Sequence, residues 1–475
     1  MSESQEQIVL FEERIPIYPR SVQGRFRNLK WAILFLAYGV YFFLPWIRWN
    51  RDSGTDQAVM FDIHDRIFYL FDMVVNPQDI FWLAGILMIA AFLLFFVTSI
   101  AGRAFCGYFC FQTLWTDVYI WIEKRIQGER PARIRLDKSA WSASKIIKKT
   151  VTHLLWLLVS FVTGLTFTLY WGDVHELIGN FFIGQAPFPA YATTLFLTLT
   201  TYVMAGLARE QVCTYMCPYA RFQSIMFDRD SMIVAYDEKR GEAETGRAKL
   251  AKGLKTEQER HEQKTGDCID CGFCVQVCPT GIDIRNGLQM SCISCALCID
   301  ACDTVMDKLG WSRGLIRYAS ENELKGKKTR LFKPKNIAYA VVLLVSIGAL
   351  VWSVLMTSQL SMAVTQVRNP LYVVLSDGRL QNSYDIKLNN KSQLPMDIDL
   401  KIKGLEGAQL DLGQIKKLQV EPLSSINLYV RIKAKPRAGI SGQIPFKFIV
   451  TSNVAGEVMR ETKNALFTMQ GKKIQ

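Results

Sequence analysis

Charge is scarce in this chain. Of its 475 residues only 21% are Asp, Glu, Lys or Arg, whereas 50% belong to the hydrophobic class. Mean hydropathy is +0.11, where a soluble domain normally falls below zero. This composition excludes a disordered chain, a small disulfide-stapled scaffold and an ordinary soluble enzyme. The length corresponds to roughly two to four domains.

Several common functional motifs are also absent. The sequence contains no phosphate-binding loop, no glycine fingerprint of dinucleotide-binding folds and no nucleophile elbow. Histidine is rare, with four residues, and no evident pair faces inside the apolar runs as axial haem ligands would. His153 is interpreted as a hydrogen-bonded interfacial residue rather than a ligand. His175 lies beside Asp173 and Glu176, a group that fits either metal or proton capture or a solvated loop.

Five apolar runs contain no charged residue. A helix that crosses a bilayer needs about 20 predominantly apolar residues, and runs near this length favour membrane spans over buried core helices. The first run is the shortest and contains Pro45. The five predicted spans are Trp31–Ile47, Ile80–Ala101, Val151–Trp171, Ala190–Ala208 and Ile337–Thr357.

Flanking charge predicts how these spans are oriented. Segments 1–30, 102–150 and 325–335 carry five, ten and six Lys or Arg, whereas 48–79 has three against six Asp and 172–189 has none. Because cytoplasmic loops retain basic residues, the three basic segments are expected inside and the other two outside. The juxtamembrane position of the basic patches favours topology over nucleic-acid binding. The part after the fifth span is basic yet expected outside, since long exported domains translocate largely regardless of charge.

The predicted order of domains follows from these spans. The fold class is an α-helical membrane protein with an inserted ferredoxin-like domain and a C-terminal immunoglobulin-like β-sandwich. The sandwich is predicted from alternating apolar and polar residues in four short segments, Asp385–Leu388, Met396–Ile402, Ile426–Ile432 and Ile444–Val450. The predicted boundaries are a cytoplasmic segment 1–30, a four-helix membrane domain 31–208, a cytoplasmic domain 209–336 with ferredoxin motifs at about 262–306, a fifth helix 337–357 and an exported sandwich 358–475.

Eight of the twelve cysteines follow one spacing twice. Each run reads C-x2-C-x2-C-x3-C, the pattern of two-cluster bacterial ferredoxins, in which the fourth cysteine binds the other cluster. Paired zinc knuckles are the alternative, but four-ligand zinc would leave a third C-x2-C step in each run unused. We therefore predict two 4Fe-4S clusters. One is held by Cys268, Cys271, Cys274 and Cys302, the other by Cys278, Cys292, Cys295 and Cys298.

The other four cysteines form two pairs with spacing i,i+4. Cys106 and Cys110 follow the second predicted span, and Cys213 and Cys217 follow the fourth. Residues four apart share a helix face, and the predicted orientation puts both pairs at the cytoplasmic edge of the membrane. Thiolates favour Cu(I), zinc or an iron–sulfur centre, so a shared redox or copper site is predicted. The alternative is that these cysteines are buried small apolar residues that only pack.

Two stretches around the membrane-edge cysteines resemble a known family. The stretches Gly102–Asp117, with Cys-Gly-Tyr-Phe-Cys, and Cys213–Asp228, with Cys-Thr-Tyr-Met-Cys-Pro, are similar to the FixG/CcoG/RdxA group of cytochrome c oxidase accessory proteins. The resemblance extends over the ferredoxin motifs, the fifth span and the C-terminal domain. In the related NapH type both membrane motifs end in Pro, whereas here Phe111 follows the first pair. The resemblance implies assembly of a cbb3-type oxidase and reduction of Cu(II) to Cu(I) for delivery.

Three hypotheses for function remain. The first is a membrane oxidoreductase that passes electrons from an unknown cytoplasmic donor through two clusters to copper at the four membrane-edge cysteines. The second is a NapH-like conduit linked to quinol, without copper chemistry. The third is a non-enzymatic scaffold whose exported domain grips an oxidase subunit. The expected partners are cbb3-type oxidase subunits or copper-delivery proteins and membrane lipid, but no nucleic acid. The expected location is the bacterial inner membrane, with cytoplasmic clusters and a periplasmic C-terminal domain.

Overall fold

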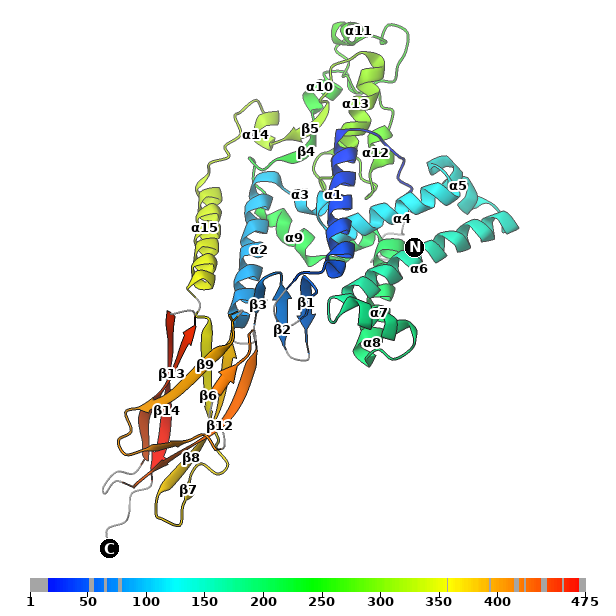
Figure 1. Cartoon of the computed structure of the whole chain (residues 1–475). Coiled ribbons are helices and arrows are strands. Elements are labelled where there is room, and N and C mark those ends of the chain that lie inside the picture. Colours follow the sequence, from blue (N-terminus) through cyan, green and yellow to red (C-terminus); the bar gives the residue numbers. More distant parts are fainter. Residues whose placement is uncertain are drawn as a thin grey trace, which may run out of the picture. The chain divides into compact units, whose positions relative to one another are not determined.

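The structure is a computed structural model of the chain (Figure 1). It describes residues 16–50, 55–63, 66–75, 79–356, 358–392, 394–413, 418–422, 424–436, 442–454 and 457–469. The chain divides into two compact units. The first comprises residues 1–46 and 81–348, and the second comprises residues 47–80 and 349–475.

Five helices in the described ranges are long and apolar enough to cross a membrane. Each contains most of one predicted run, and the second has the predicted bounds. Pro45 lies in a 3₁₀ turn, η1 (Leu44–Trp46), at the end of the first helix, because proline cannot donate a helical hydrogen bond. The helices are α1 (Arg25–Phe43), α2 (Ile80–Ala101), α6 (Ala143–Leu169), α8 (Phe188–Thr201), which continues as the π-helix η3 (Tyr202–Ala208), and α15 (Pro334–Leu355).

Helix α6 begins eight residues before the predicted run. Ser142 caps its N-terminus, and the hydroxyl accepts a hydrogen bond from the Lys145 N–H. Helices α6 and α8 pack closely at Gly164, which has no side chain. A Cβ at this position would lie only 2.7 Å from the carbonyl oxygen of Thr194. The hydroxyls of Thr168 and Thr194 are 2.8 Å apart across the same contact. Small residues and hydroxyl pairs of this kind are typical of helix contacts in membranes.

Short helices connect these long ones within the first unit. Helices α3 and α4 follow α2, and α4 packs against α6. Tyr119 of α4 stacks on Trp156 of α6, with ring centroids 5.3 Å apart, and both side chains are buried. The connecting helices are α3 (Ala104–Tyr108), α4 (Phe111–Gln127), α5 (Arg130–Lys138), α7 (Val174–Phe182) and α9 (Pro218–Met226).

The ferredoxin part is framed by one antiparallel strand pair, β4 (Ile233–Tyr236) and β5 (Ile316–Ala319). Its buried core combines cysteines with Ile299, Met306 and Trp311. Residues 237–264, a stretch rich in Glu, Lys and Arg, open this part. From its charges this stretch would be expected to be solvated, but it is packed, since Arg260 is 0% exposed and donates to backbone carbonyls. Its helices are α10 (Glu238–Glu242), α11 (Glu257–Glu262), α12 (Phe273–Val277), η5 (Ile284–Asn286), α13 (Leu297–Leu309) and α14 (Glu321–Leu324).

The second unit contains two antiparallel sheets whose buried residues form one core. One sheet has the order β10-β12-β8-β6, with β7 on β8, and the other has the order β11-β9-β13-β14. All four predicted strands lie inside β8, β9, β12 and β13. The strands are β6 (Leu360–Gln366), β7 (Val373–Val374), β8 (Leu380–Asn390), β9 (Met396–Lys403), β10 (Gln409–Asp411), β11 (Leu418–Val420), β12 (Ser425–Ala434), β13 (Gly442–Val454) and β14 (Glu457–Met469).

A small three-stranded sheet was not predicted from the sequence. It lies in the segment between the first two long helices and belongs to the second unit. Asp79, which follows it and is 4% exposed, binds the ammonium of Lys391 at 2.6 Å in the same unit. The strands are β1 (Val59–Asp62), β2 (Ile67–Leu70) and β3 (Met73–Val75).

Candidate iron–sulfur sites and membrane-edge thiols

The eight ferredoxin cysteines surround two separate cavities. Four cysteines line the first cavity. Three of them come from the first sequence run, and the fourth, Cys302, comes from the second run, thirty-one positions after Cys271. The second cavity is lined in the same crossed manner. This is the arrangement that the predicted ligation requires. The two sets are Cys268, Cys271, Cys274 and Cys302, and Cys278, Cys292, Cys295 and Cys298, with Cys274 also bordering the second cavity.

The two cysteine loops repeat one backbone conformation. Asp270 and Gly272 have φ of 49° and 64°, and Ser294 and Ala296, at equivalent places in the second loop, have φ of 53° and 59°. Non-glycine residues adopt this left-handed conformation at a cost that the surrounding structure must over-determine. Residues that alternate in this way turn successive N–H groups toward one concavity, a nest that binds anions such as iron–sulfur clusters. The donor set and the loops therefore fit 4Fe-4S clusters.

Burial controls the chemistry of these thiols. Burial raises the pKa of Cys274 and of Cys295 to about 12, with smaller contributions from neighbouring cysteines. Burial likewise raises the pKa of Cys298 and Cys302 above the ordinary value. Because the thiols favour their protonated form, iron must displace the protons when it binds. Each set contains two buried cysteines, but Cys271 of the first set is exposed, so the first cavity reaches solvent, whereas no cysteine of the second set is exposed.

The four membrane-edge cysteines lie near one another, but not on two continuous helices. Cys106 lies in α3 and Cys213 in the π-helix η4 (Val212–Met216), while Cys110 and Cys217 have extended backbones and begin α4 and α9. The expectation that each pair shares one helix face is therefore wrong. At Cys217 the reason is Pro218, because the residue before proline is driven out of the helical region. Phe111, the departure from the NapH pattern, is the first residue of α4.

The environment of these thiols shows that they are neighbours. Burial raises the pKa of Cys106 to about 12, and the thiols of Cys110, Cys213 and Cys217 each add to the shift. Burial raises the pKa of Cys213 to about 11, again with contributions from Cys110 and Cys217. The Cys106 thiol also donates a hydrogen bond to Oε1 of Gln223 in α9, at 3.1 Å. A metal ion that binds to these thiols must displace their protons.

The membrane-edge thiols adjoin the loop of the second cysteine set. Gly107 lies so close that a Cβ there would be 2.8 Å from the carbonyl oxygen of Ile293 and 3.0 Å from the Cα of Cys295. The Tyr108 hydroxyl donates to the Cys295 carbonyl at 3.3 Å, and the Arg103 guanidinium donates to the Cys292 carbonyl at 3.3 Å. The contact is apolar in its centre, where the membrane-edge residues Cys106 and Cys213 pack on Val277, Ile293, Cys295, Leu297 and Ala301.

Buried charges that the sequence analysis missed hold this region together. Asp117 of α4 is 5% exposed and binds Lys30 Nζ at 2.9 Å and Arg27 Nη1 at 3.3 Å, both in α1. Asp300 of α13 accepts hydrogen bonds from the N–H groups of Phe26 and Arg27, at the start of α1. The favourable interaction of a carboxylate with a helix N-terminus joins α1 to the ferredoxin part. In sequence these acids looked like ordinary loop and helix residues.

The structure assigns ordinary roles to the two histidines considered above. His153 Nδ1 lies 2.9 Å from the Tyr202 hydroxyl, which agrees with its interpretation as a hydrogen-bonded residue. Asp173 caps α7 by accepting from the N–H groups of His175 and Glu176, so its carboxylate serves the helix rather than a metal. Among the residues that the structure describes, the three do not form a metal-binding group.

Comparisons with known proteins agree with this arrangement. Residues 208–321 match a family described as a 4Fe-4S dicluster domain, residues 81–128 match a 4Fe-4S binding domain, and residues 350–470 match the IG-like fold at the C-terminus of FixG. The nitrogen fixation protein FixG of Rhizobium meliloti is 41% identical over 84% of this chain and 82% of its own length. Protein RdxA of Cereibacter sphaeroides is 41% identical over 89% and 90%, respectively.

A more distant relative matches about half of this chain. The ferredoxin-type protein NapH of Escherichia coli is 21% identical over 54% of this chain and 89% of its own length. Taken together, the apolar helices, the cysteine loops and these matches define an integral bacterial membrane protein that transfers electrons through 4Fe-4S sites. Within that class, the chain belongs to the FixG/RdxA family.

Proposed function

We propose that this protein reduces Cu(II) to Cu(I) during maturation of a cbb3-type cytochrome c oxidase. The observation that carries the proposal is the contact between the membrane-edge thiols and the second cysteine loop, where Gly107 lies against the backbone of Ile293 and Cys295. When bound, 4Fe-4S clusters supply one-electron reduction. Cu(II) held by thiols this close to a ligand loop would accept that electron and become Cu(I).

The chain's own residues give the route a direction. The exposed Cys271 marks the first cysteine set as the side that a cytoplasmic electron donor reaches. The second set, none of whose cysteines is exposed, adjoins Cys106 and Cys213. Soft thiolate ligands stabilise Cu(I) relative to Cu(II), so binding at the membrane-edge cysteines favours the reduced ion, which a copper-delivery protein or oxidase subunit then receives.

The proposed topology follows from flanking charge. All five long helices cross the inner membrane, the ferredoxin part (209–336) faces the cytoplasm, and the two-sheet unit is a periplasmic immunoglobulin-like β-sandwich. In this arrangement the sandwich contacts the oxidase subunit on the periplasmic side.

A second candidate for the thiol group is a third 4Fe-4S cluster. The matched segment 81–128 contains only Cys106 and Cys110, and a cluster needs four ligands. Cys213 and Cys217, which lie beside them, complete such a set. The copper form then has about eight iron atoms per chain and the cluster form about twelve.

Copper reduction is tested with anaerobically purified protein, a chemical reductant and a chelator that absorbs only with Cu(I). We expect Cys110→Ala with Cys217→Ala to abolish protein-dependent Cu(I) formation while the iron content stays near eight atoms per chain. Tyr215→Phe, which lies in the same segment and keeps both thiols, is the matched control. Undiminished Cu(I) formation in the double variant contradicts the proposal, and a loss of about four iron atoms supports the third cluster instead.

A further inference from the structure

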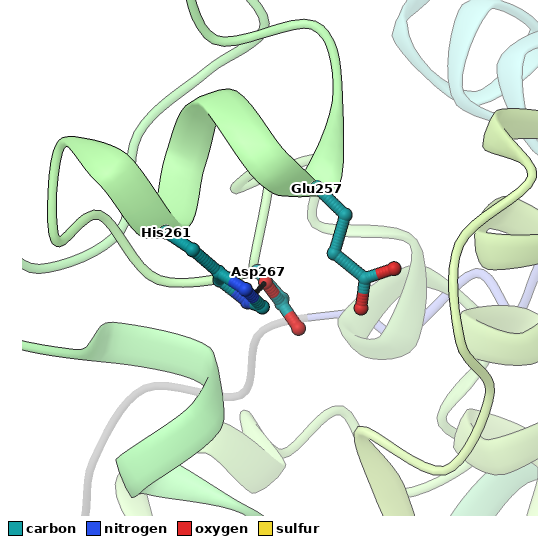
Figure 2. Close-up of side chains that lie close together, drawn as sticks. All are labelled: Glu257, His261 and Asp267. Atoms are coloured by element: carbon teal, nitrogen blue, oxygen red, sulfur yellow. Dashed lines mark ion pairs between the residues drawn. The ribbon is translucent and has the colours of Figure 1, made fainter.

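A group of three metal-ligating side chains lies in the ferredoxin part, away from the cysteine cavities. Glu257 and His261 are one turn apart on α11, and Asp267 follows the helix (Figure 2). One ligand atom from each lies within 4.8 Å of the other two. The histidine side chain is 63% exposed whereas the Asp267 side chain is 0% exposed, so the group is open to solvent on one side and closed on the other.

The buried carboxylate leaves one oxygen without a hydrogen bond. Among the described residues, Oδ1 of Asp267 has no donor in hydrogen-bonding geometry, although His261 Nε2 lies 3.3 Å away. A buried acceptor without a partner costs free energy, and more so when it is charged. Figure 2 shows the His261 ring directed at this carboxylate, with Glu257 beside them. A cation held by these side chains satisfies the oxygen.

Arg240 orients the two carboxylates. Its Nε donates to Asp267 Oδ2 at 2.6 Å, and its Nη2 lies 3.5 Å from Glu257 Oε1. Each acid therefore gives one oxygen to the guanidinium. The other oxygen of Glu257 accepts from the Ser312 hydroxyl at 3.4 Å, and Oδ1 of Asp267 lies beside His261. Such outer partners fix the direction of ligands around a metal.

The donor types define the metal. One imidazole nitrogen and two carboxylate oxygens suit a divalent transition metal, and among these Cu(II) binds such sites most strongly. Cu(I) prefers soft sulfur ligands, so this group discriminates between the two oxidation states in the opposite sense to the membrane-edge thiols. Asp267 directly precedes Cys268 of the first cysteine set.

We propose that Glu257, His261 and Asp267 form a Cu(II)-binding site on the cytoplasmic side of the protein. The inference rests on the proposed function, because it identifies where the oxidised substrate is first held. The site concentrates Cu(II) on the protein before the ion passes to the membrane-edge thiols for reduction, and its ligands hold Cu(II) in preference to Cu(I).

The test uses the full-length protein without a histidine tag, with its clusters oxidised and therefore EPR-silent. Cu(II) is added below one equivalent, in a Cys110→Ala, Cys217→Ala background that removes two of the four membrane-edge thiols. We expect an EPR signal with nitrogen hyperfine splitting. His261→Ala should remove the splitting and, like Glu257→Gln, weaken binding by at least about tenfold. Unchanged iron content shows that each variant is folded.

His175→Ala is the matched control, since His175 also lies beside an Asp and a Glu but those side chains do not form such a group. It should leave the signal and the affinity unchanged. The inference is overturned if the parent protein shows no nitrogen-coupled Cu(II), or if His261→Ala retains it. Cu(I) formation and Cu(II) binding measured on wild-type protein purified in the same way separate the two proposals. Copper reduction that persists with no Cu(II) at His261 overturns only the site, and bound Cu(II) that is never reduced overturns only the proposed function.

Discussion

Cys302 is the residue that distinguishes crossed from sequential ligation. It lies in the second cysteine run but lines the cavity of Cys268, Cys271 and Cys274. We therefore expect Cys302→Ser to damage the first cluster and Cys278→Ser the second. EPR of the reduced protein at low temperature measures each cluster in turn. Loss of the second cluster alone in Cys302→Ser contradicts the crossed assignment.

Asp117 allows the contribution of one buried charge to the stability of the fold to be measured. Asp117→Asn leaves the Lys30 ammonium, whose side chain is 1% exposed, without its counter-charge. Breaking a buried ion pair in this way costs about 3–5 kcal/mol. We expect a clear fall in the thermal unfolding temperature. Exposed Lys325–Glu321 provides the matched control, because removing a surface pair by Glu321→Gln costs about 0–1 kcal/mol. Equal effects of the two substitutions would contradict the role of burial.

The same carboxylate predicts how stability depends on pH. Burial opposes ionisation of Asp117, but Lys30 and Arg27 outweigh it and hold its pKa below the ordinary value. A lowered pKa in the folded state contributes stability that is complete above the unfolded pKa of about 3.9 and is lost as pH falls through the folded value. We expect the difference in unfolding temperature between wild type and Asp117→Asn to shrink as pH falls below about 4. A difference that grows on acidification would contradict this sign.

At the scale of elements, α3 is the connection between the membrane edge and the ferredoxin part. Gly107 allows it to approach because an added Cβ would be 2.8–3.0 Å from backbone atoms, which cannot rotate away as a side chain can. We expect Gly107→Ala to cost about 1–3 kcal/mol through overpacking. It should also slow Cu(I) formation while the iron content is retained.

Gly179→Ala is the control for this substitution, since a Cβ there has no atom within 4 Å. It should leave both stability and Cu(I) formation near the wild-type values. If Gly107→Ala behaves like Gly179→Ala, the approach of α3 to the loop of Ile293 and Cys295 is not required for electron transfer.

At the scale of the whole molecule, the prediction with the widest consequences is the side of the membrane on which each part of the chain lies. A reporter that is active only outside the cytoplasm, fused after residue 475, should be active. The same reporter inserted at Ser139, in the basic segment between α2 and α6, should be inactive, because cytoplasmic loops retain Lys and Arg. A reversed pattern contradicts the topology and with it the proposed cytoplasmic electron donor.

Local sequence determined the parts of this protein that depend on neighbours along the chain. An apolar run long enough to span a bilayer is a property of about 20 consecutive residues, and α2 has the predicted bounds Ile80–Ala101. Cysteine spacing predicted the ligand sets in the same way, since three thiols separated by two residues each can wrap one cluster. Alternation with period two located β12 and β13 because each inward side chain is followed by an outward one.

Tertiary structure alone decided how distant residues meet. Cys106 and Cys213 are more than a hundred positions apart, and the packing of α3 against α9 and the ferredoxin part makes them neighbours. The same holds for Asp117 with Lys30, which sequence patterns did not single out. Periodicity cannot reveal such contacts, because a charged residue in a short helix looks the same whether it faces water or a buried partner. The metal-ligating group of His261 and Asp267 was missed for that reason, since a stretch rich in Glu, Lys and Arg predicts a solvated surface.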